Sequence, residues 1–219
     1  MSDLAHNDYA LLSTAYLPPV DYFRVMRTHG GFVIESHENY QKQSYRNRCC
    51  IYSANGVMPL VIPIVRSGGK QLITEVRIDY TKEWQKQHWG AIYSAYKSTP
   101  FFDYYQNDIY PFYSSVKEES LFELNNKLFS IILDILNFSS TINCTSDYKE
   151  ESPNDFRNSI HPKRESPITP NSRLSVNITD TDRNPHKYHQ LFSHKYGFAA
   201  NLSIIDLLFN EGPDSILYL

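Results

Sequence analysis

"YALLSTAYLPPVDYFRVMRTHGGFVIES", residues 9–36, decides the fold that we expect for this chain. Residues 9–17 form an apolar run of strand length, which two prolines end. Residues 20–29 carry apolar side chains at helical spacing, and a pair of glycines follows as a stop signal. Residues 32–36 read as a second short strand. A strand, a helix and a strand in this order predict a βαβ unit with parallel strands.

The rest of the chain predicts a meander and then helices. Residues 48–79 contain three strand-like runs, and Asn55-Gly56 between the first two is a strong hairpin signal. Apolar residues at helical spacing then predict helices, one with a break before its proline, in residues 82–98, 100–115, 120–138 and 201–213. We therefore expect an α/β (or α+β) fold, with a βαβ opening, a mostly antiparallel meander and a helical half that packs on the sheet.

One long segment is poor in large apolar side chains. Residues 146–186 are filled mainly by Pro, Ser, Asn, Asp, Lys and Arg. A structureless loop of that length is unusual inside a compact domain. We interpret it as a polar excursion or lid on a single domain that spans residues 1–219.

Composition and charge exclude several classes of protein. The 219 residues carry a formal charge of −3, so no global basic field points to nucleic acid. No apolar run reaches the roughly 20 residues of a membrane span, and no secretory signal is evident. The 3 cysteines, an odd count, fit a reducing compartment. We expect a cytoplasmic protein without membrane insertion, and the sequence leaves its oligomeric state open.

Motif searches support neither a metal nor a common cofactor. The phosphate-binding loop, the dinucleotide-binding glycine motif and the hydrolase nucleophile elbow are all missing. Cys49 and Cys50 are adjacent, without the spacing of a zinc site. His186, His189 and His194 form a local group, but no acidic or thiol ligand joins them in spacing. We predict no metal site, and the cofactor is unknown.

The stretch "YQKQSYRNR", residues 40–48, is the best candidate for ligand binding. If it enters the following strand directly, alternation sends Arg46 and Arg48 to one face and Asn47 to the other. Two guanidinium groups on one face would form a fork suited to phosphate or carboxylate. The alternative is a solvated strand edge whose cations prevent pairing with other strands.

Two further residues are candidates for proton transfer. His88 lies between Trp84 and Ile92 on one helical stripe, so it is either a core residue or a group that faces a pocket. Asp206 lies in an apolar run and needs either a partner or a solvent-facing position.

The sequence resembles the WbqC-like protein family over almost the whole chain. The family's opening is matched by "STAYLPPVDYF" and its Asn-Arg segment by "NYQKQSYRNRC", with Ser13 and Thr14 in place of the family's Gln-Pro. The matched motifs further along the chain are "PLVIPI", the helix with Trp84, His88, Ile92 and Tyr96, and the ending "NLSIIDLLFNEGP". This form resembles members from the Bacteroides side of the family.

The resemblance implies a cytoplasmic role in the biosynthesis of O-antigen (the lipopolysaccharide side chain) or another bacterial surface polysaccharide. A transferase step onto an amino or hydroxyl group of a nucleotide-activated sugar is the reaction that we expect, with His88 and Asp206 as catalytic residues. With the resemblance, we interpret residues 40–48 as a pocket wall for a small anionic ligand. The predicted substrate-binding residues are Tyr16, Tyr40, Lys42, Arg46, Asn47, Arg48, His161, Lys163 and Asn201.

The fold prediction also places a ligand site. α/β sheets keep their crevices at the carboxyl ends of the strands, and the helix N-terminus at residues 20–23 would offer backbone N–H groups to an anion. The alternative function is a non-catalytic binding or scaffold protein of the glycan machinery. The 17 tyrosines and 12 phenylalanines favour it, because aromatic side chains are enriched at protein interfaces.

Overall fold

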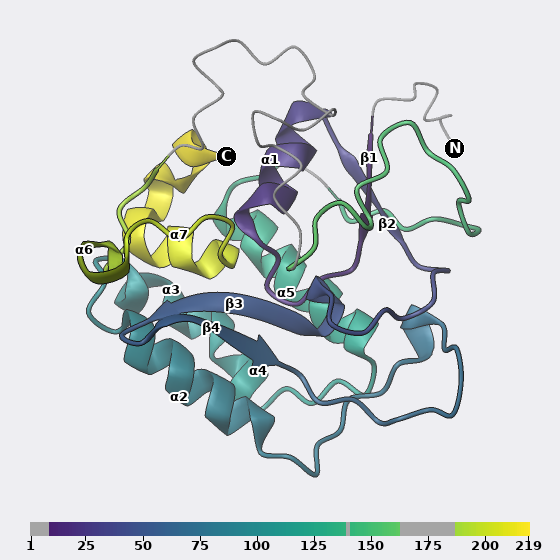
Figure 1. The fold of residues 1–219 in the computed structure, drawn as a ribbon, viewed down its shortest axis with the longest axis horizontal. Helices are drawn as coiled ribbons and strands as arrows, with labels where there is room; N and C mark the ends of the chain where they lie inside the picture. Colours follow the sequence, from purple (N-terminus) through teal and green to yellow (C-terminus); the bar gives the residue numbers. More distant parts are fainter. Residues whose placement is uncertain (1–8, 139–140, 163–186) are drawn as a thin grey trace.

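The predicted βαβ opening is present in the structure. The computed structural model describes residues 9–138, 141–162 and 187–219. Strands β1 (Ala10–Ser13) and β2 (Phe32–Glu35) pair in parallel, and helix α1 (Val20–Thr28) connects them (Figure 1). The prediction for residues 9–36 is therefore confirmed.

The parallel pair is extended on both sides by short bridges. Asp155 forms a parallel bridge with Leu11 of β1, and Cys144 forms one with Ile34 of β2. Four chain segments thus run in the same direction, although only β1 and β2 are long enough to be strands. Their carboxyl ends meet at one edge, which is where α/β sheets keep their ligand sites.

The hairpin is also confirmed, but the third strand of the meander is not. β3 (Arg48–Ser53) and β4 (Gly56–Val61) pair antiparallel. Residues 71–79 instead contain a short 3-10 helix, η2 (Ile73–Glu75), with only single bridges around it. The buried side chains are Ile73, Val76 and Ile78. Ile73 and Val76 are three positions apart, and the helical turn brings these two to one side, whereas strand alternation would separate them.

The helical half agrees with the sequence prediction. Its helices are α2 (Trp84–Tyr96), α3 (Phe102–Ile109), α4 (Pro111–Ser114), α5 (Leu121–Ile135), α6 (Ser193–Tyr196) and α7 (Ile204–Glu211). Two 3-10 helices join them: η1 (Tyr45–Asn47) directly precedes β3, and η4 (Gly212–Tyr218) directly follows α7. The break before the proline separates α3 from α4. The Ser120 hydroxyl caps α5 by accepting a hydrogen bond from the Glu123 amide at 3.4 Å.

The helices pack on both sheets and form one connected core. Phe129 of α5 contacts Phe23 of α1 and Phe32 of β2, with ring centroids 5.7 and 5.3 Å apart. The hairpin lies between α7 and α2 (Figure 1), and the Tyr52 amide of β3 donates to the Tyr96 hydroxyl of α2 at 3.0 Å. In the described part of the chain, no helix is long and apolar enough to cross a membrane.

The polar excursion is described only in part. Residues 146–162 follow an irregular path that is held to β1 by the bridge at Asp155. The remainder of the predicted lid, residues 163–186, lies outside the described residues.

Candidate functional site

Polar and charged side chains gather where the parallel strands end. Ser13 is the last residue of β1, and Glu35 is the last residue of β2. Thr145 directly follows the Cys144 bridge, and Arg157 comes two residues after the Asp155 bridge. Because the segments run in parallel, these side chains meet at the same edge of the sheet.

Glu35 is completely buried and fully supplied with hydrogen-bond donors. The Thr145 hydroxyl donates to Oε1 at 2.7 Å, and the His37 amide donates to the same oxygen at 2.8 Å. The Lys149 amide and Arg157 Nη1 donate to Oε2 at 3.0 and 3.3 Å. An ionised carboxylate accepts about four hydrogen bonds, so this buried charge is satisfied. Glu35 therefore anchors the excursion to the end of β2.

Glu38, three residues further, forms a second buried ion pair. Arg46 Nε donates to its Oε1 at 2.8 Å, and Arg46 Nη2 donates to its Oε2. The Ser13 hydroxyl donates to Oε2 at 3.2 Å and accepts from Arg46 Nη2 at 2.6 Å. Glu38 and Arg46 are 4% and 2% exposed. We call Ser13, Glu35, Glu38, Arg46 and Arg157 the arginine–glutamate network.

Arg157 links the carboxylates of Glu35 and Asp155. Its Nε lies 3.0 and 3.1 Å from the two carboxylate oxygens of Asp155, and its Nη2 donates to Asp155 Oδ2 at 2.6 Å. These hydrogen bonds raise the pKa of the guanidinium group further. The Tyr148 ring lies 5.2 Å from the guanidinium carbon, within the range of a cation–π contact.

A pocket of about 310 Å³ opens beside this network. Its lining residues are Glu38, Asn39, Tyr40, Gln41, Lys70, Tyr148, Arg157 and Asn158. The wall thus combines a carboxylate, two cations, three amides and two phenols. Burial raises the pKa of Tyr40, so its hydroxyl is protonated at neutral pH and can donate a hydrogen bond.

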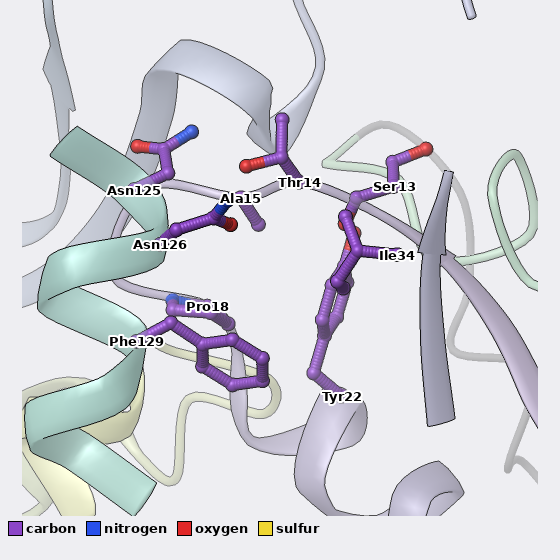
Figure 2. Close-up of a pocket in the computed structure, with 9 residues that line it drawn as sticks. All are labelled: Ser13, Thr14, Ala15, Pro18, Tyr22, Ile34, Asn125, Asn126 and Phe129. Carbon is purple, nitrogen blue, oxygen red and sulfur yellow. The ribbon is translucent and has the colours of Figure 1, made fainter. Parts of the chain in front are cut away.

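A narrow crevice lies on the other side of Ser13. Figure 2 shows it between the turn after β1 and helix α5, with Phe129 and Asn125 on one side and Tyr22 on the other. It is too narrow for a water molecule. The buried Oγ1 of Thr14 and Oδ1 of Asn125 in its wall have no hydrogen-bond partner among the described residues. Ser13 lines this crevice and its hydroxyl reaches Glu38 of the pocket, so one side chain connects both spaces.

The predicted pocket wall at residues 40–48 has a different local structure from the one that we expected. Residues 45–47 form the 3-10 helix η1 and not the start of a strand, so the predicted alternation of Arg46 and Arg48 is wrong. The Ser44 hydroxyl caps this turn by accepting from the Arg46 amide at 3.4 Å. Arg46 is consequently buried beside Glu38, and no open fork of two guanidinium groups forms.

The structure brings some of the remaining predicted binding residues near the pocket. Tyr40 lines it, and the half-buried Arg48 lies close enough for its charge to oppose the rise in the pKa of Tyr40. The side-chain Nδ2 of Asn47 instead donates to the Ile62 carbonyl at 2.8 Å, which fixes the chain directly after β4. Lys42 is exposed and His161 is half-buried, and neither lines the pocket. Lys163 lies outside the described residues.

The α1 N-terminus, predicted as an anion site, is already occupied. The Val20 amide donates to the Leu202 carbonyl at 3.0 Å. The Asp21 amide donates to Oδ1 of Asn201 at 3.2 Å. Asn201 therefore satisfies the end of α1, and the prediction that these amides are open to a ligand is wrong.

His88 lies in a hydrogen-bonded chain within the core. Its Nδ1 is 3.0 Å from the Tyr16 hydroxyl, which is 2.6 Å from the Tyr113 hydroxyl. The Trp84 ring packs against it at 5.2 Å. Burial lowers the pKa of His88 to about 4, so the imidazole is neutral at physiological pH. His88 and the predicted binding residue Tyr16 do not line the pocket.

Asp206 is surrounded by neutral hydrogen-bond donors. The Tyr96 hydroxyl donates to its Oδ1 at 2.8 Å, and the Tyr188 hydroxyl donates to its Oδ2 at 2.7 Å. The side-chain Nε2 of Gln190 also donates to Oδ2, at 3.3 Å. Burial raises the pKa of Asp206 to about 6, and these donors hold it lower than burial alone would. We call these residues the tyrosine–aspartate network. Asp206 is 1% exposed and does not line the pocket.

Sequence reasoning missed most of the pocket. In the arginine–glutamate network beside the pocket, Ser13 and Glu35 had a usable signal, because each is a polar residue at the carboxyl end of a predicted parallel strand. Glu38 follows closely, but Arg157 and Tyr148 lie in a polar segment without periodicity. The described residues contain no group of three or more His, Cys, Asp or Glu that could hold a metal ion.

Comparisons with known proteins place the chain in a family. No solved structure matches it. An uncharacterized protein of Mycobacterium tuberculosis, Rv1507c, is 28% identical over 226 residues, which cover 96% of each chain. The model of the WbqC-like protein family matches residues 14–164 and 170–218. This chain, with its arginine–glutamate network at the ends of two parallel strands, belongs to the WbqC-like protein family.

Proposed function

We propose that the pocket binds a small polar ligand with an anionic group, and that a nucleotide-activated sugar is this ligand. The observation that carries the proposal is the pocket itself, which opens beside a buried charge network where parallel strands end. Its volume of about 310 Å³ falls in the usual range for small-molecule sites, roughly 300 to 1,000 Å³.

The lining supplies the groups that a sugar phosphate needs. The amides of Asn39 and Gln41 and the Glu38 carboxylate suit hydroxyl groups. Tyr40 and Tyr148 present aromatic rings and hydroxyls, which suit a ring with an apolar face and polar edges. The exposed Lys70 supplies a cation for phosphate.

The biological role is the finer part of the proposal. We place the protein in the cytoplasm, as a single domain of the Bacteroides type, in the biosynthesis of O-antigen or another surface polysaccharide. There it would act as a transferase on an amino or hydroxyl group of the nucleotide-sugar, without nucleic acid as a partner. The resemblance of the sequence and the polar pocket support this role. His88 and Asp206 stay predicted catalytic residues, although neither lines the pocket.

A thermal-shift screen tests ligand binding. The full chain is melted with UDP-glucose, UDP-N-acetylglucosamine, GDP-mannose and dTDP-glucose, and with the corresponding nucleoside diphosphates. A ligand at about 100 times its dissociation constant adds about 2.7 kcal/mol, which is a clear upward shift in Tm. The shift should shrink in Lys70→Ala and Tyr148→Ala, and it should persist in Arg77→Ala, a matched surface control. No shift with any nucleotide-sugar would contradict the proposal.

A second candidate function is a scaffold for other glycan enzymes. Tyr93 and Tyr110 are 47% and 44% exposed. Tyr110 packs against the half-buried Trp89, and Tyr93 packs against the buried Phe102, so exposed aromatic rings lie on α2 and at the end of α3. Exposed aromatic groups of this kind mark partner surfaces. Surface glycan is measured in cells that carry Tyr93→Ser/Tyr110→Ser or Lys70→Ala/Tyr148→Ala. Loss of glycan only in the first of these variants would favour the scaffold, and loss only in the pocket variant would favour ligand binding.

A further inference from the structure

The charge balance of the network restricts what the pocket can recognise. Arg46 is 2% exposed and gives Nε and Nη2 to Glu38 and Ser13. Arg157 directs all three of its nitrogens to Asp155 and Glu35. Both guanidinium charges are therefore matched by carboxylates inside the protein. A diphosphate bound by these arginines would have to compete with carboxylates that are already in place.

Lys70 differs from both arginines. It is exposed at the wall of the pocket, and no carboxylate lies within ion-pair distance of it in the described part of the chain. Lys70 therefore offers an unmatched positive charge to an anionic group of the ligand.

Glu38 retains capacity to accept a hydrogen bond. An ionised carboxylate has about four acceptor sites. Among the described residues, Oε2 accepts from Arg46 Nη2 and from the Ser13 hydroxyl, whereas Oε1 accepts from Arg46 Nε alone. One site on Oε1 remains, and Glu38 is the carboxylate among the lining residues. The two contacts from Arg46 and the one from Ser13 fix the orientation of this carboxylate before any ligand arrives.

Together these observations assign different parts of the ligand to Glu38 and to Lys70. Resting on the proposed function, we infer that the sugar part of the ligand lies against Glu38, which accepts a hydrogen bond from a sugar hydroxyl or amino group. Arg46 and Ser13 are positioning residues for that carboxylate, and Lys70 contacts the phosphate. Glu38 thus determines selectivity for the sugar, whereas Lys70 contributes to binding of any nucleotide.

Titration calorimetry with two kinds of probe separates these roles. The full chain is titrated with UDP-N-acetylglucosamine and UDP-glucose, and with UDP as the probe without a sugar. Glu38→Gln should lower affinity for the sugar-bearing probes by about 10- to 100-fold, the usual worth of a hydrogen bond to a charged group, and leave UDP unchanged. Lys70→Ala should weaken all three probes by a similar factor. The matched control is Glu118→Gln, which removes the carboxylate from a surface ion pair with Lys127 and should change none of them.

Two further variants keep the test decisive. Glu38→Gln leaves the Arg46 charge buried without a counter-ion, so its fold is checked first by circular dichroism. Glu38→Asp keeps the charge but withdraws it by one methylene, and it should show the same selective loss for the sugar-bearing probes. Arg46→Lys keeps the cation but loses the two-pronged contact, and it too should affect only those probes. A purely structural role of Arg46 would weaken UDP equally.

The outcomes distinguish this inference from the proposed function. Wild-type affinity for the sugar-bearing probes in folded Glu38→Gln or Glu38→Asp overturns the inference, while the proposed function stands. A wild type that binds neither these probes nor the other nucleotide-sugars of the thermal-shift screen overturns both. An equal loss for UDP and the sugar-bearing probes in the Glu38 variants also overturns the inference, because Glu38 would then act on the nucleotide or on the fold.

Discussion

Two buried carboxylates of this protein have different surroundings. Glu38 faces the Arg46 guanidinium and the wall of a pocket, whereas Asp206 faces Tyr96, Tyr188 and Gln190. Among the described residues, a cation compensates the first charge, whereas neutral dipoles compensate the second. Burial therefore raises the pKa of Asp206 to about 6.

The difference shows that burial of a charge does not by itself identify a site. The tyrosine–aspartate network ties α7 to α2 and to residues 188–190, and Asp206 does not line the pocket. The arginine–glutamate network also ties segments together, but it contributes residues to an open pocket. Glu38 is the stronger candidate for ligand contact because its carboxylate is held in a fixed orientation and also lines an open pocket.

The largest effect is expected when the buried ion pair is broken from one side. Arg46→Met leaves the Glu38 carboxylate buried without its cation, which should lower the free energy of unfolding by about 3–5 kcal/mol. The double variant Arg46→Met/Glu38→Leu removes both charges and should recover much of that loss. Urea unfolding measures both. A single variant as stable as the double variant would mean that the pair is not coupled.

His88 should give stability that depends on pH. Its pKa is lowered from 6.5 to about 4, so the folded state binds fewer protons than the unfolded state between these values. Stability from this group is complete above pH 6.5 and falls as the pH drops toward 4, by on the order of 3 kcal/mol. In His88→Gln this slope should vanish. Urea unfolding of variant and wild type from pH 4 to 7 gives the difference, and parallel curves would contradict the expectation.

Asp206 should give a slope of opposite sign over nearly the same range. Its pKa is raised from 3.8 to about 6, so the folded state holds the proton more tightly. Its contribution is complete below about pH 4 and is lost as the pH rises through 6, again by on the order of 3 kcal/mol. Asp206→Asn should therefore gain stability relative to wild type from pH 4 to 7. Because the two slopes have opposite signs, they should largely cancel in the wild type between pH 4 and 6. A wild type that loses the full amount over this range, with His88→Gln unchanged from it, would contradict this cancellation.

The smallest effect is expected at an ion pair on the surface. Arg77 and Glu119 form a contact of 2.9 Å, but their side chains are 70% and 80% exposed. Arg77→Met should lower the free energy of unfolding by less than about 1 kcal/mol, because water already solvates both charges. Comparison with Arg46→Met shows how much larger the loss of unfolding free energy becomes when the ion pair that is broken is buried. A cost as large as that of Arg46→Met would remove the basis of the comparison.

The sequence by itself determined the local elements of this protein. The change from a short apolar run to helical spacing and back predicted β1, α1 and β2. Asn55-Gly56 predicted the hairpin, and apolar residues at i+4 steps predicted α2 and α5. These signals are readable because they depend on backbone geometry and burial within one segment.

Local patterns did not determine the turn at residues 45–47 or the segment at 71–79. In the first, the Ser44 cap and a 3-10 turn replaced the expected strand entry and carried Arg46 inward. In the second, a 3-10 turn at residues 73–75 brought both Ile73 and Val76 into the core, although alternation would place them on opposite faces. Both segments are short, and the packing partners decide between two local structures of similar energy.

Only the tertiary structure decided the candidate site. Glu35 meets Arg157 and Asp206 meets Tyr96 across more than 100 positions of the chain. No periodicity records such pairs, because they follow from the order of the parallel segments and from the helices that cover them. The sequence placed Ser13 and Glu35 at the ends of strands, and the parallel pairing of those strands brought the ends together with Glu38 and Arg157 beside one pocket.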